Sequence, residues 1–193
     1  MAQLHILRVF VGEDGAGGNP LGVFLEGDEV PEEERQSVAA DLGFSETVFV
    51  EDPGRGEVRI FTPATELQFA GHPLVGTAWL LAHEGSGVSV LRPPAGEVPT
   101  RTEGDLTFIS GRPEWGPPFE HIELGSPGEV EALEGPPDDH DLVGVWAWQD
   151  REAGVARVRV FAPRVGVVED EATGSHAVGL AAWLGRRITI RQG

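Results

Sequence analysis

The sequence predicts an α+β protein made of two related halves, each combining strands with one central buried helix. The main observation is an internal repeat, in which the segment VRIFTP at 58–63 reappears as VRVFAP at 158–163. Each copy leads to a glycine with polar neighbours and then to a small, apolar helical segment, near Pro73 in the first half and His176 in the second. Chance similarity between two strand–helix units is the alternative, but it is a poor explanation for so many identical residues at matched positions. The repeat predicts pseudo-twofold symmetry, with two equivalent loops at helix N-termini facing each other across a cleft.

The individual elements follow from periodicity and turn residues. Alternating apolar and polar residues between glycine and proline turns predict strands at 4–10, 21–25, 45–51 and 57–62. Helical spacing predicts a helix at 31–42, with a proline and acids at its start and Gly43 as its stop. The segment 73–83 is small and apolar throughout, which indicates a helix buried on nearly all sides.

Two stretches rich in proline and glycine organise the rest of the chain. The first, 92–104, marks the expected boundary between an N-terminal half at 1–98 and a shortened C-terminal half at 99–193. The second, 111–141, is acidic and is expected to be loop with little helix.

Composition narrows the function classes. The 193 residues carry 32 acids against 14 bases, a net charge of −18, which disfavours nucleic acid and anionic membranes as partners. With no signal-like or membrane-spanning run, the expectation is a cytoplasmic protein. The chain lacks Cys, Lys and Tyr, which excludes thiolate sites, a pyridoxal Schiff base and a complete phosphate loop. Acid–base chemistry therefore falls to carboxylates and the six His.

Glu46 is the first candidate for that chemistry. It stands inside the apolar and hydroxylic run GFSETVF at 43–49. A carboxyl placed there would lose solvation, which raises its pKa toward the range of a general acid or base. The alternative is an outward-facing acid on a half-exposed strand.

Two loops supply further candidates. In FAGHP, at 69–73, His72 precedes a proline suited to the start of a helix, where amide donors hold an anion, or it merely caps the helix. In EDEATGSH, at 169–176, Thr173 or Ser175 is a candidate N-cap, and the repeat favours Asp170 and Ser175 facing His72 across the cleft. His83, His121 and His140 receive no role. No histidine pair shows ligand spacing, so no metal is expected.

Together these segments resemble the phenazine-biosynthesis PhzF-like family. GGNPL at 17–21, SET at 45–47, FTP at 61–63, FAGHP at 69–73 and DEATGS at 170–175 match its signature segments, in order and over most of the chain. The resemblance implies the diaminopimelate-epimerase-like fold, with two barrel-like halves that each wrap a sheet around a central helix. It also implies cofactor-independent isomerisation by proton transfer on a small carboxylate-bearing cyclic or unsaturated metabolite, commonly by a homodimer.

The resemblance assigns roles residue by residue. Glu46 would be the catalytic acid–base, while Gly71, His72, Asp170, Gly174 and Ser175 would bind the substrate. Related epimerases of the fold use paired Cys, which this chain lacks.

The sequence departs from the family pattern at two places. Glu171 and His176 stand where the family usually has a proline and a small residue, and both are expected to add ionisable groups at the pocket edge. The alternative function is therefore a catalytically inactive small-molecule-binding or interaction protein of the same fold.

Overall fold

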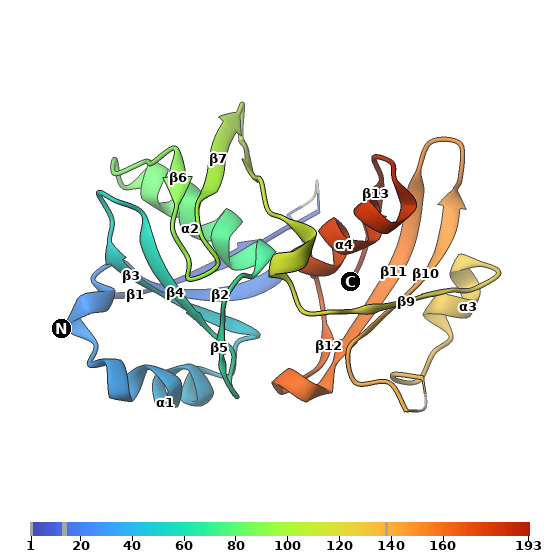
Figure 1. Cartoon of the computed structure of the whole chain (residues 1–193), viewed down its shortest axis with the longest axis horizontal. Helices are drawn as coiled ribbons and strands as arrows, with labels where there is room; N and C mark the ends of the chain where they lie inside the picture. The colour runs from blue at the N-terminus through green and yellow to red at the C-terminus, as the bar shows by residue number, and fades with distance from the viewer. Residues whose placement is uncertain (1, 13–14, 138) are drawn as a thin grey trace. The chain divides into compact units, whose positions relative to one another are not determined.

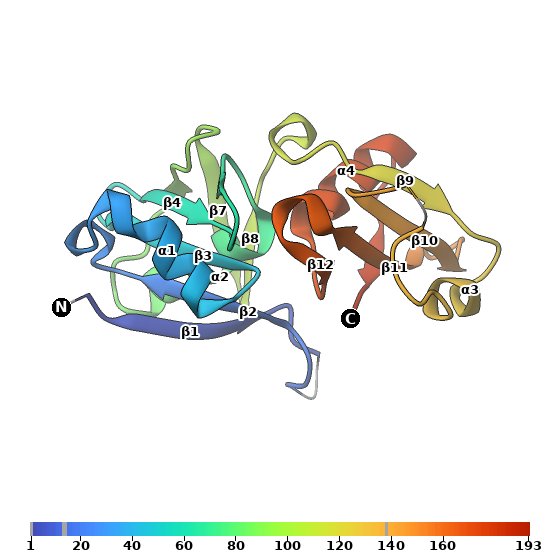
Figure 2. The same cartoon turned by 90° about the horizontal axis from the view of Figure 1, so that it is seen from below.

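The computed structural model describes residues 2–12, 15–137 and 139–193, which form two compact units (Figures 1 and 2). Unit 1 is Met1–Gly111 and unit 2 is Arg112–Gly193. The sequence placed the division at residues 98 and 99. Strand β7 (Val98–Glu103) begins there and pairs with β8 (Leu106–Ile109), so this hairpin belongs to unit 1.

Unit 1 contains a five-stranded sheet whose order follows the chain. Its strands are β1 (Leu4–Val9), β2 (Asn19–Phe24), β3 (Glu46–Asp52), β4 (Glu57–Phe61) and β5 (Glu66–Leu67). Neighbours are antiparallel except for β2 and β3, which are parallel. A parallel pair needs a crossover, and the 3₁₀ turn η1 (Gly27–Glu29) and helix α1 (Glu32–Leu42) supply it. The stacked rings of Phe24 and Phe49 form part of the core beneath α1.

Helix α2 (Gly71–His83) is the central helix of unit 1 (Figure 1). It contacts β1, β2 and β3. It also contacts β8, the edge strand of a second sheet in the order β6 (Val90–Leu91), β7, β8. Small residues permit this close approach, because a side chain at Gly76 would overlap Leu21 and Val9. The expected burial of the helix on nearly all sides is therefore observed, and the helix begins at Gly71, two residues before the expected start.

Unit 2 is built around helix α4 (Gly174–Leu184) and a sheet in the order β12-β11-β10-β9. Its elements, in chain order, are η2 (Pro113–Trp115), β9 (Glu120–Glu123), α3 (Pro127–Glu131), β10 (Val143–Asp150), β11 (Val155–Ala162), η3 (Pro163–Val165), β12 (Val167–Asp170), α4 and β13 (Thr189–Arg191). Leu180 of α4 packs against Trp146 and the buried face of β11. Strand β13 pairs with the start of β11 in parallel.

The two units share one topology. In each, a strand runs parallel to the next after a helical crossover, two antiparallel strands follow, and a helix leads to a short strand. Thus β2-α1-β3-β4-β5-α2-β6 corresponds to β9-α3-β10-β11-β12-α4-β13. The sequence predicted a buried helix in both units, which is wrong for unit 2: of the residues of α4, His176 and Leu180 are buried, and Trp183 is 61 % exposed. The repeated order of strands and helix predicted from the sequence is present, and the fold is the expected α+β class.

The acidic segment 111–141 contains more structure than its composition indicated. It includes β9 and the short helix α3, which begins at Pro127 and is capped by Ser126. The sequence of β9 is EHIE, which carries a single strong apolar residue and no strand signal by itself. Parallel pairing with the buried strand β10 recruits it, so tertiary context overrides a weak local propensity. Across the described residues, no helix is both long and apolar enough to span a bilayer.

The corresponding glycines of the two central helices provide a matched test of packing. A Cβ at Gly76 would lie 2.6 Å from Leu21 Cδ2 and 2.8 Å from Val9 Cγ2, whereas at Gly179 the nearest atom is 3.6 Å away. Gly76→Ala should therefore lower the free energy of unfolding by about 1–3 kcal/mol through overpacking. Gly179→Ala should raise it by up to ~1 kcal/mol through helix propensity. Urea denaturation measures both, and equal stabilisation by the two changes would contradict the packing of α2.

Candidate functional site

Glu46 is placed by the start of β3. Helix α1 ends at Gly43, whose left-handed backbone (φ 68°) turns the chain into the strand. Glu46 then pairs in register with Leu21 of the parallel strand β2, and the residue is 8 % exposed. Ser45 beside it donates a hydrogen bond of 2.7 Å to Asn19 Oδ1. The outward-facing alternative is therefore wrong, because parallel pairing buries the start of the strand.

His72 lies in the first turn of α2 and approaches the same carboxyl. Its Nδ1 is 3.4 Å from Glu46 Oε2, and the residue is 2 % exposed. Burial lowers the pKa of His72 to about 3, although a hydrogen bond to the Pro20 backbone acts in the opposite direction. The imidazole is therefore neutral near pH 7. Its Nε2 is buried without a hydrogen-bond partner among the described residues.

The second loop is organised around Asp170, at the end of β12. Asp170 is 7 % exposed and accepts a hydrogen bond of 2.7 Å from Thr173 Oγ1. Gln192 holds the loop from the other side: its Nε2 donates to the Asp170 carbonyl at 2.7 Å, and its Oε1 accepts from the Thr173 amide at 3.2 Å. Thr173 occupies the N-cap position of α4 as expected, but no side-chain capping hydrogen bond forms.

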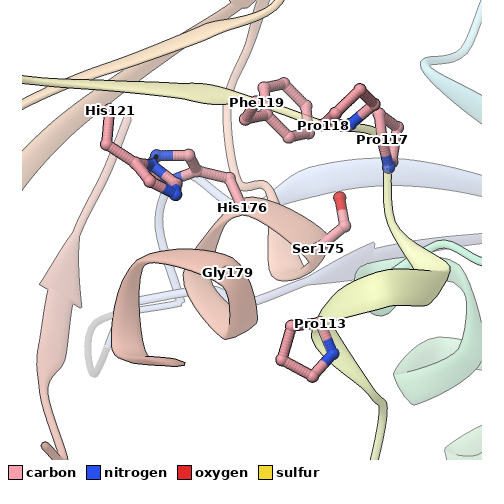
Figure 3. A pocket seen from close by; sticks show the side chains of 8 residues that line it. All are labelled: Pro113, Pro117, Pro118, Phe119, His121, Ser175, His176 and Gly179. Atoms are coloured by element: carbon pink, nitrogen blue, oxygen red, sulfur yellow. Dashed lines mark hydrogen bonds between the residues drawn. The ribbon is translucent and has the colours of Figure 1, made fainter. Parts of the chain in front are cut away.

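Ser175 and His176 follow in the first turn of α4 and line a cavity of about 130 Å³ (Figure 3). The residues that line this cavity all belong to unit 2: Pro113, Pro117, Pro118, Phe119, His121, Ser175, His176 and Gly179. His121 Nδ1 and His176 Nε2 are 3.1 Å apart. Burial lowers the pKa of His176 to about 3, with a further contribution from His121, and burial also lowers the pKa of His121.

The structure sorts the predicted site residues into two sets. Gly71, His72 and Glu46 come together in unit 1, while Asp170, Gly174 and Ser175 lie on one loop and helix start in unit 2. The expected cleft shared by both loops stays a prediction.

The departures at 171 and 176 differ in their surroundings. Glu171 is exposed, whereas His176 is fully buried and covers Gly144. Two residues were not identified as site residues by the sequence reasoning. Gln192 is distant in sequence from the loop that it holds, and His121 received no role because its strand had no clear signal.

Comparisons with known proteins identify the family. The sequence profile of the PhzC-PhzF family, described as phenazine biosynthesis-like protein, matches residues 8–142 and 137–193. A trans-2,3-dihydro-3-hydroxyanthranilate isomerase of Pseudomonas fluorescens is 34% identical over 218 residues, covering 91% of this chain and 77% of the relative. An uncharacterized isomerase of Pseudomonas aeruginosa is 32% identical over 204 residues, covering 89% and 77%.

Solved structures agree on the fold. A PhzF-family protein of Bacillus anthracis superposes with a TM-score of 0.77 at 21% identity, covering 100% of this chain and 86% of that one. A predicted epimerase from Pseudomonas aeruginosa gives 0.70 at 23% identity, covering 95% and 81%. The fold is thus that of the diaminopimelate-epimerase-like proteins. The protein is an isomerase of the PhzF type. The chain belongs to the phenazine biosynthesis-like PhzC-PhzF family.

Buried neutral histidines make the protein sensitive to acid. Between the ordinary His pKa of 6.5 and the lowered value of about 3, an unfolded chain binds protons at His72 and His176 that the folded chain does not. The free energy of unfolding should therefore fall as the pH falls through this window, by up to ~1.4 kcal/mol per pH unit for each histidine.

The test is urea denaturation from pH 7 to 4.5. His176→Phe removes one of the two titrating groups. In this variant the free energy of unfolding should therefore decrease less steeply as the pH falls, by the contribution of one histidine. The matched change His83→Phe, at an exposed position, should leave the slope as it is. Parallel curves for all three proteins would contradict the buried neutral state of His176.

Proposed function

We propose that this protein is a cofactor-independent isomerase that moves a proton on a small carboxylate-bearing cyclic or unsaturated metabolite. The observation that carries the proposal is the buried carboxyl of Glu46, 3.4 Å from a neutral His72 at the start of α2. A carboxyl that exchanges a proton with carbon needs a site shielded from water, together with a neighbour that does not hold it in a permanent ion pair.

The proposed step is a balanced proton shift. The Glu46 carboxylate accepts a proton from one substrate carbon, and the electron pair of that C–H bond moves into the adjacent unsaturated system. The resulting carboxylic acid returns the proton to another carbon, where a new C–H bond forms as the double bond shifts. No oxidant or reductant is consumed, and His72 acts as a polar neighbour 3.4 Å from the carboxyl that fixes its position.

Substrate binding is proposed for the two helix starts. The amides of Gly71 and His72 open α2, and those of Gly174 and Ser175 open α4, where backbone N–H groups without helical partners favour an anion. The buried Nε2 of His72 is a further polar group at the first of these positions. Asp170, held by Thr173 and Gln192, is proposed to accept a hydrogen bond from a substrate donor. The substrate named for the curated relatives, a dihydro-hydroxyanthranilate, has the cyclic carboxylate character that such donors suit.

Glu46→Gln tests the acid–base role. The amide keeps the shape of the side chain and part of its hydrogen bonding but cannot carry the proton, so turnover should fall by about 10²–10⁴-fold while the protein still folds. The measurement is the isomerisation rate with trans-2,3-dihydro-3-hydroxyanthranilate and related cyclic acids, together with thermal melting. In heavy water, the wild-type product should carry deuterium at the newly protonated carbon in the fraction of turnovers in which the Glu46 carboxyl proton exchanges with solvent before it is returned.

Glu57→Gln is the matched control, since Glu57 pairs with Arg55 at the surface of the neighbouring strand β4. It should keep wild-type turnover because a surface ion pair contributes little. Near-normal turnover of Glu46→Gln would assign the proton transfer to another group. If the wild type turns over none of these acids but binds them, the non-catalytic binding protein becomes the better conclusion.

We also propose that two copies associate through an apolar face of unit 1. Five exposed apolar side chains gather around a hollow of about 510 Å³ that is bordered by β1, α2 and β8: Ile6, Phe10, Val11, Trp79 and Leu106. Both β1 and β8 end their sheets as described, so their outer backbone groups are open to pairing. The charged lining residues are one base, Arg8, and one acid, Asp105. In a chain of net charge −18, such a balanced face is where a second copy meets the least repulsion.

Light scattering should report a dimer at micromolar concentration. Leu106→Glu, at a 63 % exposed position on β8, should shift the protein to monomer because it places an unpaired charge in the apolar face. Val168→Glu is the matched control in unit 2, at a 69 % exposed position on β12, and should remain dimeric. A monomeric wild type, or dissociation by Val168→Glu alone, would contradict association through this face.

A further inference from the structure

We propose that the histidine pair His121 and His176 binds one divalent transition-metal cation of the class that prefers imidazole ligands, such as Zn²⁺ or Cu²⁺. The inference concerns a cavity wall within unit 2 and is independent of the chemistry proposed for Glu46.

The pair is assembled from three elements that fit one another. His121 on β9 and Gly144 on β10 are register partners in the parallel pair of strands. A Cβ at Gly144 would lie 1.8 Å from His176 Nε2, so only a glycine leaves room for this ring. His176 then reaches from α4 across Gly144 to His121, with Phe119 packed edge-on against it. Both rings are therefore carried by regular structure and held by packing, which is the preorganisation that a binding site needs.

The separation of the two ring nitrogens suits chelation. His121 Nδ1 and His176 Nε2 are 3.1 Å apart, and their ring planes are inclined at 61°. A cation at the usual Zn–N distance of about 2.0–2.1 Å from both nitrogens would have an N–metal–N angle of roughly 100°. This lies between the right angle of a square or octahedral site and the tetrahedral angle. The cation would take the place of the hydrogen between the two nitrogens, and the ring that carried this hydrogen would hold it on its other nitrogen, so that both ligands are neutral imidazoles.

The rest of the coordination shell must come from water. Across 2–12, 15–137 and 139–193, no group of three or more His, Cys, Asp or Glu side chains is placed to hold a metal ion. The two rings instead form part of the wall of the cavity of about 130 Å³, which has room for several water molecules. Ser175, which precedes His176 in the first turn of α4 and also lines the cavity (Figure 3), adds a hydroxyl that can hydrogen-bond such waters. Two imidazoles with water ligands select borderline cations over Mg²⁺ or Ca²⁺, which prefer carboxylate oxygens.

The surroundings of the pair act on a cation in opposite directions. His176 is fully buried and its Nδ1 lacks a hydrogen-bond partner among the described residues, so a ring that binds a cation through Nε2 keeps an unpaired Nδ1–H, which weakens binding. In contrast, the chain carries a net charge of −18, which raises the local concentration of cations around it. The same charge creates a competing explanation, namely loose binding to surface carboxylates, and the experiment must separate the two.

Isothermal titration of the full chain with Zn²⁺ tests the proposal. The wild type should bind one Zn²⁺, and His121→Gln and His176→Gln should each weaken binding by at least about tenfold, the loss that even an outer-shell partner can cost. His121→Gln is the safer variant for folding because His121 is only partly buried, and thermal melting checks that both variants fold. His83→Gln, which removes an exposed imidazole from unit 1, should bind Zn²⁺ like the wild type.

Cu²⁺ provides a second readout that does not depend on affinity. Its electron paramagnetic resonance spectrum in the wild type should show coupling to two imidazole nitrogens, and this signal should be lost in His121→Gln. Equal Zn²⁺ binding by all variants, or competition by millimolar Mg²⁺, would assign the cation to surface carboxylates and overturn the proposal. Failure of the wild type to bind Zn²⁺ at millimolar concentration would overturn it as well.

Discussion

The close packing of α2 against the sheet of unit 1 is the constraint on which the candidate site depends. The helix approaches the strands so closely that Gly76 has no space for a side chain beside Leu21 and Val9. This depth places the first turn of the helix next to the start of β3, where Glu46 lies. A bulkier helix would stand further from the sheet, and His72 would no longer reach the carboxyl. Packing that appears purely structural thus fixes the distance between two polar groups.

The buried polar side chains of the two helix starts differ in how far their hydrogen bonds are satisfied. Asp170 is buried but receives hydrogen bonds within its own loop, and Gln192 links that loop to the last strand. His72 and His176 are buried in the neutral state, and each retains one ring nitrogen without a hydrogen bond in the described structure. Such groups lower stability, and they persist in proteins where a site uses them. The two helix starts are therefore among the places where buried polar groups without hydrogen bonds lower the stability of this protein.

The two units share one topology but carry different residues at equivalent positions of their central helices. In unit 1 the third residue of α2 is Pro73, whereas in unit 2 the third residue of α4 is His176. That change requires Gly144 in the facing strand and brings His121 into hydrogen-bonding distance. One substitution in a repeated framework thus creates a polar cavity wall. The framework tolerates it because strand register places a glycine opposite the larger side chain.

The sequence by itself determined the α+β class, the repeated order of strands and helix, and the identity of Glu46, His72 and Asp170 as candidates. These follow from local signals, since periodicity, turn residues and internal identities are properties of short segments. It did not determine β9, whose strand forms only because β10 offers a parallel partner. Nor did it determine the contact of His121 with His176, because these residues lie 55 positions apart and meet only through strand register and helix packing. Only the tertiary structure decides such contacts, since long-range pairing depends on which surfaces the whole fold brings together.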